Sequence, residues 1–268
     1  MLLRTFTAIA SLLIANTGHA GMLYTIADST NTLEKVDTST MLRTVVGSTG
    51  VASGNFGGLA YDAVGDTLYW VPGRGNANLY TINRNTGAAS LVGAHGVNDL
   101  FGLEFDASTG SLYGTQFSGG SNLYRLNAGT GASTLVGNMG LGIGGLAYDS
   151  KRNRLVGVMD GSGSLYTVNR STAALSLLAS PGGNDDSGLA YDHNADLFYN
   201  YDWQGRLFRI DPNAGYARTT LFVGTGAHDG LAYVGDAVQG TVPEPAGLGL
   251  VALGLVGLLA TRRRTAAR

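Results

Sequence analysis

The sequence predicts an all-β protein, a single five-bladed β-propeller, from regularities spread along its 268 residues. The motif GLAYD or a close variant recurs at intervals of 44, 43, 43 and 42 residues, beginning at Gly58, Gly102, Gly145, Gly188 and Gly230. Each full interval contains several short runs of strand-forming residues separated by turn formers. A repeat of roughly 40 to 45 residues with four strands per unit is typical of propeller blades.

The stretch from Gly58 to Gly93 shows the strand pattern of one repeat. GLAYD at Gly58, LYWV at Leu68, LYTIN at Leu79 and ASLVG at Ala89 are short runs that favour β-strands. They are separated by VGD, PGRGN and NTG, which favour turns. Four short antiparallel strands in this length make one blade.

The two ends of the repeat region complete one blade between them. Near the N-terminus, residues 23–26, 33–36 and 44–47 match the second, third and fourth strands, but no first strand precedes them. GLAYV at Gly230 is a first strand with no later strands after it. We therefore predict that the C-terminal strand joins the N-terminal blade and closes a propeller over residues 21–235. Such closure covers a sheet edge that would otherwise invite aggregation.

Residues 1–20 have the pattern of a secretory signal peptide. Arg4 precedes a largely apolar stretch at 6–14, and Gly18 and Ala20 place small residues before a cleavage between Ala20 and Gly21. The alternative is a first buried strand. A signal peptide would direct the body of the protein out of the cytoplasm.

A tripartite tail at 242–268 follows a linker at 236–241. Pro243, Glu244 and Pro245 lead into an apolar run at 246–260, and three arginines follow at 262–264. This apolar run is shorter than the roughly 17–25 residues that span a bilayer comfortably. The arginines favour the cytoplasmic side. The tail therefore indicates transient anchoring in the inner membrane, with a simple permanent anchor as the alternative.

The order of these three parts closely resembles the PEP-CTERM sorting signal of Gram-negative bacteria. The resemblance covers about the last 26 residues of the chain. It implies that an exosortase recognises Pro243, Glu244 and Pro245, that the tail is removed, and that the protein reaches the cell envelope or the extracellular matrix. The repeat body, with units such as LYTINRNTGAASLVG, resembles uncharacterised bacterial secreted propeller repeats, which implies a fold and no activity.

Composition narrows the classes of function. Without its two ends the body keeps 12 basic and 18 acidic side chains, a charge of about −6, which argues against nucleic acid as a partner. There is no cysteine, and His95, His193 and His228 do not have metal-ligand spacing. No catalytic motif is assembled. We therefore expect a non-enzymatic binding or structural role, with an extracellular polysaccharide or another envelope protein as partner; the alternative is a secreted hydrolase or lyase with an acidic site.

Loops after the second and fourth strands of each blade share one side of the ring, which we call the upper face. These loops vary in residue type, and ligands of propellers usually bind there by analogy of fold. Trp203 offers a flat apolar ring beside carboxylates, which suits sugar stacking with hydrogen bonds to hydroxyl groups. The carboxylates could hold Ca²⁺, although no calcium-loop spacing occurs and no other cofactor is expected. The predicted ligand-binding residues are Asp28, Asp99, Asp160, Asp185, Asp186, Asp202, Trp203 and Asp229.

Two alternatives and two further features accompany this prediction. The upper loops could be merely solvated, and Trp203 could pack under its own loop.

The aspartates that end the GLAYD motifs are predicted to be turn residues whose side chains bind nearby backbone amides: Asp62, Asp106, Asp149 and Asp192. Glu104 replaces the alanine found at its position in the other four motifs. It is expected to line the channel as a hydrated or arginine-paired side chain, with a functional role as the alternative.

Overall fold

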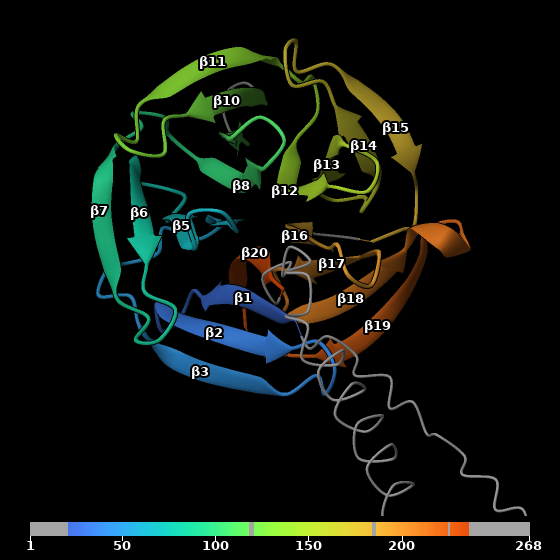
Figure 1. Ribbon diagram of the computed structural model, residues 1–268, viewed down its shortest axis with the longest axis horizontal. Coiled ribbons are helices and arrows are strands. Elements are labelled where there is room, and N and C mark those ends of the chain that lie inside the picture. Colours follow the sequence, from blue (N-terminus) through green and yellow to red (C-terminus); the bar gives the residue numbers. More distant parts are fainter. Residues whose placement is uncertain (1–20, 118–120, 184–185, 225, 236–268) are drawn as a thin grey trace, which may run out of the picture. The chain divides into compact units, whose positions relative to one another are not determined.

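The computed structural model describes residues 21–117, 121–183, 186–224 and 226–235, which form a ring of five four-stranded antiparallel sheets (Figure 1). This confirms the predicted five-bladed β-propeller. The described part contains one helical turn, the 3-10 helix Pro212–Ala214. All its other regular secondary-structure elements are strands. No helix among the described residues is long and apolar enough to cross a membrane. The predicted signal peptide, the PEP motif and the apolar run lie outside the described residues.

Each blade has its first strand innermost and its fourth strand at the rim (Figure 1). Blade 1 contains β20 (His228–Val234), β1 (Met22–Ala27), β2 (Thr32–Asp37) and β3 (Arg43–Ser48). Blade 2 contains β4 (Gly58–Asp62), β5 (Thr67–Val71), β6 (Asn78–Ile82) and β7 (Ala89–Ala94). Blade 3 contains β8 (Leu100–Asp106), β9 (Ser111–Gln116), β10 (Asn122–Leu126) and β11 (Ser133–Asn138). Blade 4 contains β12 (Ile143–Asp149), β13 (Arg154–Met159), β14 (Leu165–Val168) and β15 (Leu175–Ala179). Blade 5 contains β16 (Asp186–Asp192), β17 (Leu197–Asp202), β18 (Arg206–Asp211) and β19 (Ala217–Val223).

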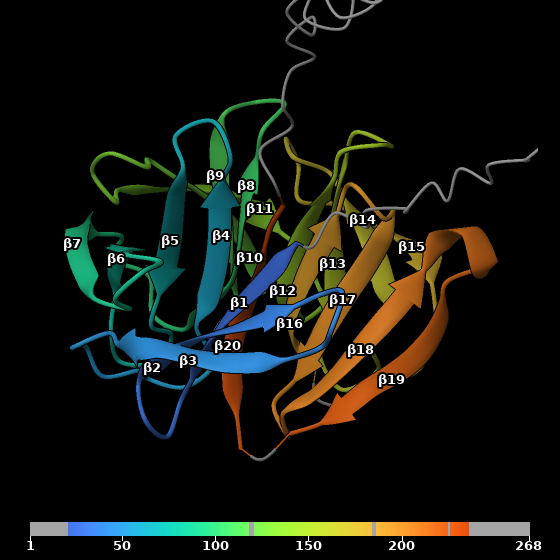
Figure 2. The same ribbon diagram turned by 60° about the horizontal axis from the view of Figure 1, so that its bottom comes forward.

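The ring closes through antiparallel pairing of β20 with β1 (Figure 2). Met22 lies opposite Val234, and Leu23 lies opposite Tyr233. The side chain of Thr25 adds a hydrogen bond of 3.0 Å to the carbonyl oxygen of Gly230. The predicted closure of the N-terminal blade by the C-terminal strand is therefore confirmed.

The glycine of each GLAYD motif is required by crowding of the inner strands. A Cβ atom added at Gly58 would collide with the carbonyl oxygen of Phe101 and lie 2.7 Å from the amide nitrogen of Leu103 in the next blade. At Gly230, where φ is +56°, it would collide with Leu59 and lie 2.8 Å from the carbonyl carbon of Gly58. A ring of five blades brings the inner strands this close, and only a residue without a side chain fits.

The hydrophobic core lies between neighbouring blades rather than in one centre. Between blades 1 and 2, Tyr24 and Leu33 pack with Leu68 and Trp70. Equivalent clusters occupy the other interfaces, and each includes the leucine of a GL motif: Leu59, Leu103, Leu146, Leu189 and Leu231, all at most 2% exposed. Burial of such a side chain stabilises the fold by about 1.5–3 kcal/mol. Blade contacts therefore hold the ring together.

The motif aspartates act as turn residues on the lower face, as predicted. The carboxylate of Asp62 accepts a hydrogen bond from the amide of Val64 at 2.9 Å, and that of Asp106 accepts one from Ser108 at 2.9 Å. Asp149 and Asp192 accept the equivalent bonds from Arg152 and Asn194. Two of the turns also tie neighbouring blades, because Arg170 pairs with Asp106 at 2.9 Å and Arg152 pairs with Asp196 at 2.7 Å.

Glu104 lies on the inner strand β8 and is half-buried. Burial raises the pKa of its carboxyl well above the usual range, and the nearby charge of Asp106 acts in the same direction. No arginine or lysine among the described residues forms an ion pair with it. The arginine-paired alternative therefore has no support in the described part of the chain.

Candidate binding site at the upper face

Four aromatic side chains form a row on the upper face. The Phe56 ring stacks on Phe101 at a centroid distance of 5.3 Å and on Trp203 at 5.7 Å, and Phe101 stacks on Phe117 at 5.2 Å. We call Trp203, Phe56, Phe101 and Phe117 the aromatic row. Its members come from blade 5, from the loop between blades 1 and 2, and from blade 3. Residues far apart in the sequence therefore meet across the ring.

The Phe56 loop is held in an unusual backbone conformation. Asn55 and Phe56 have φ values of +66° and +60°, which are costly for residues with side chains and rare for bulky ones. Two backbone hydrogen bonds fix the loop on blade 2: Gly54 donates to Pro72 at 2.8 Å, and Arg74 donates to Asn55 at 3.3 Å. Strain of this kind is often concentrated at functional sites.

Arg74 places a positive charge next to the row. Its guanidinium carbon lies 4.8 Å from the Phe56 centroid and 5.6 Å from the Phe101 centroid, within the range of cation–π attraction. The side chain is exposed, and no carboxylate among the described residues pairs with it. Its guanidinium therefore has no carboxylate partner within the described part of the chain.

The structure brings some of the predicted acidic residues near the row. The amide of Phe117 donates to the carbonyl oxygen of Asp99 at 3.1 Å, so Asp99 adjoins one end. The amide of Asp160 donates to Gly142 at 3.1 Å, and a Cβ atom at Gly142 would lie 2.7 Å from the Phe117 ring. Asp99 and Asp160 thus belong to the loops that border Phe117.

The remaining predicted residues differ in their surroundings. Asp28 accepts a hydrogen bond from Ser53 at 3.0 Å, in the loop that leads to Phe56. Asp202 is 0% exposed, and its carboxylate binds the Arg206 guanidinium at 2.6 Å and two backbone amides. It is engaged as a turn residue. Asp185 lies outside the described residues, as do the side chains of Asp186 and Asp229; the backbones of the last two pair with Asp202 and Ile26.

Trp203 is 42% exposed and stacks on Phe56 from another blade. This arrangement differs from a ring packed under its own loop. The row itself was missed by sequence reasoning, although one signal was present: Phe101 precedes GL where the other repeats have Gly57, Gly144, Ser187 and Asp229. The repeat spacing gives no reason to place Phe56 or Phe117 beside Phe101.

A polar cluster of buried His228 and Glu34 with the more exposed Arg43 lies at the ring closure. The imidazole Nε2 of His228 lies 3.1 Å from Glu34 Oε2 and 3.3 Å from Arg43 Nη1, and its Nδ1 lies 3.1 Å from the carbonyl oxygen of Gly226. The hydrogen bond from His228 lowers the pKa of Glu34, assisted by the charges of His228 and Arg43. These groups satisfy one another inside blade 1. Among the described residues, no group of three or more His, Cys, Asp or Glu could hold a metal ion.

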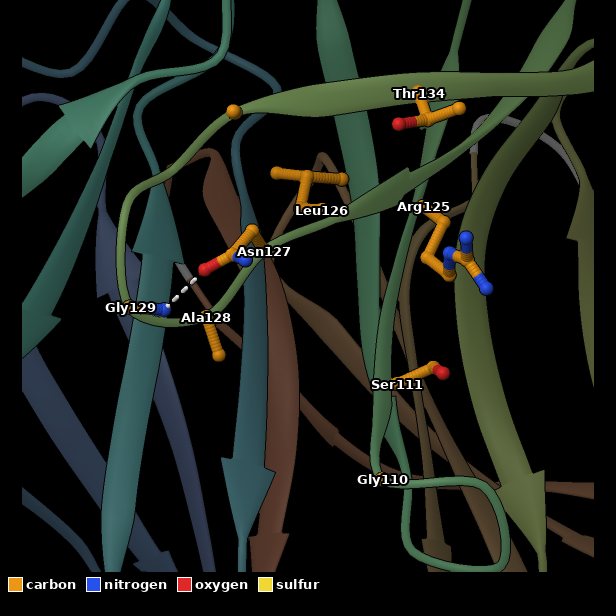
Figure 3. Close-up of a pocket in the computed structure, with 9 residues that line it drawn as sticks. Gly110, Ser111, Arg125, Leu126, Asn127, Ala128, Gly129 and Thr134 are labelled. Atoms are coloured by element: carbon orange, nitrogen blue, oxygen red, sulfur yellow. Dashed lines mark hydrogen bonds between the residues drawn. The ribbon is translucent and has the colours of Figure 1, made fainter.

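A hollow of about 420 Å³ lies on the lower side of blade 3 (Figure 3). Arg125 is the charged side chain in its lining, and the Asn127 amide oxygen is occupied by the amide of Gly129 at 2.9 Å. The other lining residues are mostly small turn residues. The hollow therefore offers one cation and no aromatic surface, in contrast to the upper face.

Comparison with known proteins agrees with this architecture. Residues 241–264 match the family model of the PEP-CTERM protein-sorting motif, while no curated protein matches the chain. A chain in the crystal structure of a nidogen/laminin complex is 15% identical with a TM-score of 0.54, and the match covers 80% of each chain. A structural genomics protein of unknown function from Bacteroides thetaiotaomicron VPI-5482 is 16% identical with a TM-score of 0.56, over 81% of this chain and 65% of the other.

At these identities the structural likeness shows the fold alone. The chain is therefore a five-bladed β-propeller protein that carries a PEP-CTERM sorting motif, as the resemblance of its tripartite tail implied. The motif implies an exported protein with a C-terminal sorting signal that an exosortase processes.

Proposed function

We propose that the mature protein is a non-enzymatic binding protein of the cell envelope or extracellular matrix, with its binding site at the upper face. The observation that carries this proposal is the aromatic row, which ends in the half-exposed ring of Trp203. Saccharides present apolar C–H faces that stack on such rings, and aromatic rings at binding sites combine large contact area with little lost side-chain freedom. An extracellular polysaccharide is the partner that this surface fits best.

Rigidity of the scaffold supports a binding role. Phe56 is fixed by backbone bonds to blade 2, and its ring is held between Trp203 and Phe101. A ligand would therefore meet rings that are already ordered, so little conformational entropy would be lost on binding. The alternative function, a hydrolase or lyase, needs an acid and a base near the bound sugar, and Asp99 and Asp160 are the described candidates at the Phe117 end.

Binding of the full-length protein to a panel of bacterial polysaccharides, in a detergent without sugar groups, tests the proposal. Trp203→Ala should weaken binding about fivefold or more, since stacking on one ring is worth on the order of 1 kcal/mol or more. Leu91→Ala is the matched control, because Leu91 is also an exposed apolar side chain (63%) but lies at the rim on β7. Equal losses in both variants, or no binding at all, would contradict the proposal. New reducing ends or unsaturated sugars would favour the enzyme.

A further inference from the structure

Resting on the proposed binding function, we propose that the upper face selects a saccharide that bears a carboxylate, such as a uronate residue in an otherwise neutral polysaccharide. Trp203 would stack on a pyranose ring, and Arg74 would bind the carboxylate. Both side chains contact the Phe56 ring, so one short stretch of polymer can reach both.

The Trp203 ring provides the apolar half of the site. Phe56 supports it by stacking at 5.7 Å and an interplanar angle of 30°, and 42% of the residue remains exposed. A sugar ring that covers the exposed surface would remove apolar area from water on both partners, which is favourable. Because Phe56 is itself held by Phe101, the Trp203 platform is ordered before the ligand arrives.

Arg74 provides the charged half. Several other described arginines already pair with carboxylates: Arg43, Arg84, Arg152, Arg154, Arg170 and Arg206. Arg74 instead lies over Phe56 and Phe101, and the cation–π contact orients the guanidinium while its N–H groups stay available. A planar guanidinium binds a planar carboxylate through two parallel hydrogen bonds. A carboxylate on the sugar is therefore the group that would pair with the Arg74 guanidinium.

Charge around the row limits how acidic the ligand can be. Asp28, Asp99 and Asp160 lie in the neighbouring upper loops, and the body of the protein carries about −6. Repulsion from these carboxylates would weaken the binding of a densely charged polymer. Charges in solution interact over about one Debye length, roughly 8–10 Å. A polymer with isolated carboxylates meets Arg74 without this penalty. Its hydroxyl groups can donate to the carboxylate of Asp99, which is a hydrogen-bond acceptor.

The test compares a tetrasaccharide that contains one uronate with its methyl ester, which has the same shape without the charge. Calorimetry on the full-length protein in sugar-free detergent should give at least about tenfold tighter binding for the acid, as expected for a hydrogen bond to a charged group. Arg74→Gln should abolish this preference, so that acid and ester bind with similar affinity. Trp203→Ala should weaken both ligands. Arg84→Gln is the matched control, since Arg84 also lies over an aromatic ring, Tyr61, at 5.1 Å but on the lower face.

The outcomes separate this inference from the proposed function. Equal affinities for acid and ester overturn the inference while leaving a polysaccharide-binding propeller. Absence of binding to either overturns the inference, and the proposed function fails with it only when the polysaccharide panel does not bind either. A preference that survives Arg74→Gln, or that Arg84→Gln removes equally, also overturns the inference. If Arg74→Gln lowers the melting temperature, Arg74→Lys keeps the charge but not the two-pronged geometry and should retain only part of the preference.

Discussion

His228 and Glu34 are 194 positions apart, yet the imidazole Nε2 of His228 lies 3.1 Å from Glu34 Oε2 inside blade 1. His228 opens the C-terminal strand β20, and Glu34 lies on β2 of the N-terminal part. The contact therefore ties the two ends of the propeller together beyond the backbone pairing of β20 with β1. Tyr201 of blade 5 packs against the same imidazole at 4.7 Å.

Removal of Glu34 should weaken ring closure. Glu34→Gln leaves the buried imidazole of His228 and the partly exposed Arg43 without their carboxylate, a change that should cost about 1–3 kcal/mol. Urea unfolding at pH 7 measures the loss. Asp66→Asn is the control, because its pair with Arg84 is exposed and should contribute at most about 1 kcal/mol. Similar losses for both variants would contradict a role of the cluster in closure.

The same pair predicts a pH dependence. The pKa of Glu34 is lowered from its ordinary value of 4.5 in the folded protein, mainly by the hydrogen bond from His228. The carboxylate therefore contributes stability above the unfolded-state pKa, and this contribution disappears as pH falls below about 4.5 through the folded-state pKa. Unfolding free energies from pH 7 to pH 3 should fall less steeply in this acid range for Glu34→Gln. Parallel curves would exclude the linkage.

His95 predicts a second pH window. Burial lowers the pKa of its imidazole to about 4, so the unfolded chain binds more protons than the folded protein between pH 6.5 and about 4. Stability should therefore decrease as pH falls through this window. His95→Gln should reduce the decrease, at some cost at pH 7 because Nδ1 of His95 accepts the amide of Val97 at 3.2 Å. Denaturation midpoints measured every half pH unit test this, and an unchanged slope would contradict it.

The motif glycines should tolerate no side chain. Gly58→Ala forces a Cβ atom into the carbonyl oxygen of Phe101 and to 2.7 Å from the amide of Leu103, and overpacking of this kind costs about 1–3 kcal/mol or more. Gly129→Ala is the control, because its Cβ would meet only the Asn127 side chain at 3.5 Å. Thermal unfolding should show a large loss for the first variant and almost none for the second. Equal melting temperatures would contradict the crowded inner ring.

Processing of the two ends remains a prediction. We expect cleavage between Ala20 and Gly21 and removal of the tail near Pro243, Glu244 and Pro245. Intact mass of the protein recovered from the envelope or the medium measures both events. Glu244→Ala should cause a membrane-bound precursor to accumulate. A wild-type product that retains the apolar run at 246–260 would indicate a permanently anchored protein instead.

Trp203 shows how much of the candidate site can be predicted from residue type alone. Its identity and its place in an upper loop led to the prediction of a binding residue, which stays a prediction; the structure shows that its ring is partly exposed. Its support by Phe56 was not predictable, because no repeat pattern relates a loop of blade 5 to the loop between blades 1 and 2. Asp202 shows the opposite case: it was grouped with the exposed carboxylates, whereas the Arg206 guanidinium and backbone amides occupy its buried side chain.

The sequence by itself determined the number of blades, the order of their strands and the closure of the ring. These features depend on local periodicity, because strands, turns and motif glycines recur every 42 to 44 residues. The strands and turns of each blade can therefore be predicted from its own repeat. Only the tertiary structure decided the aromatic row, the position of the Arg74 guanidinium over Phe56 and the pairing of His228 with Glu34. These contacts join residues that the repeat pattern does not relate, and their distances depend on how the strands and loops of five blades pack into one ring.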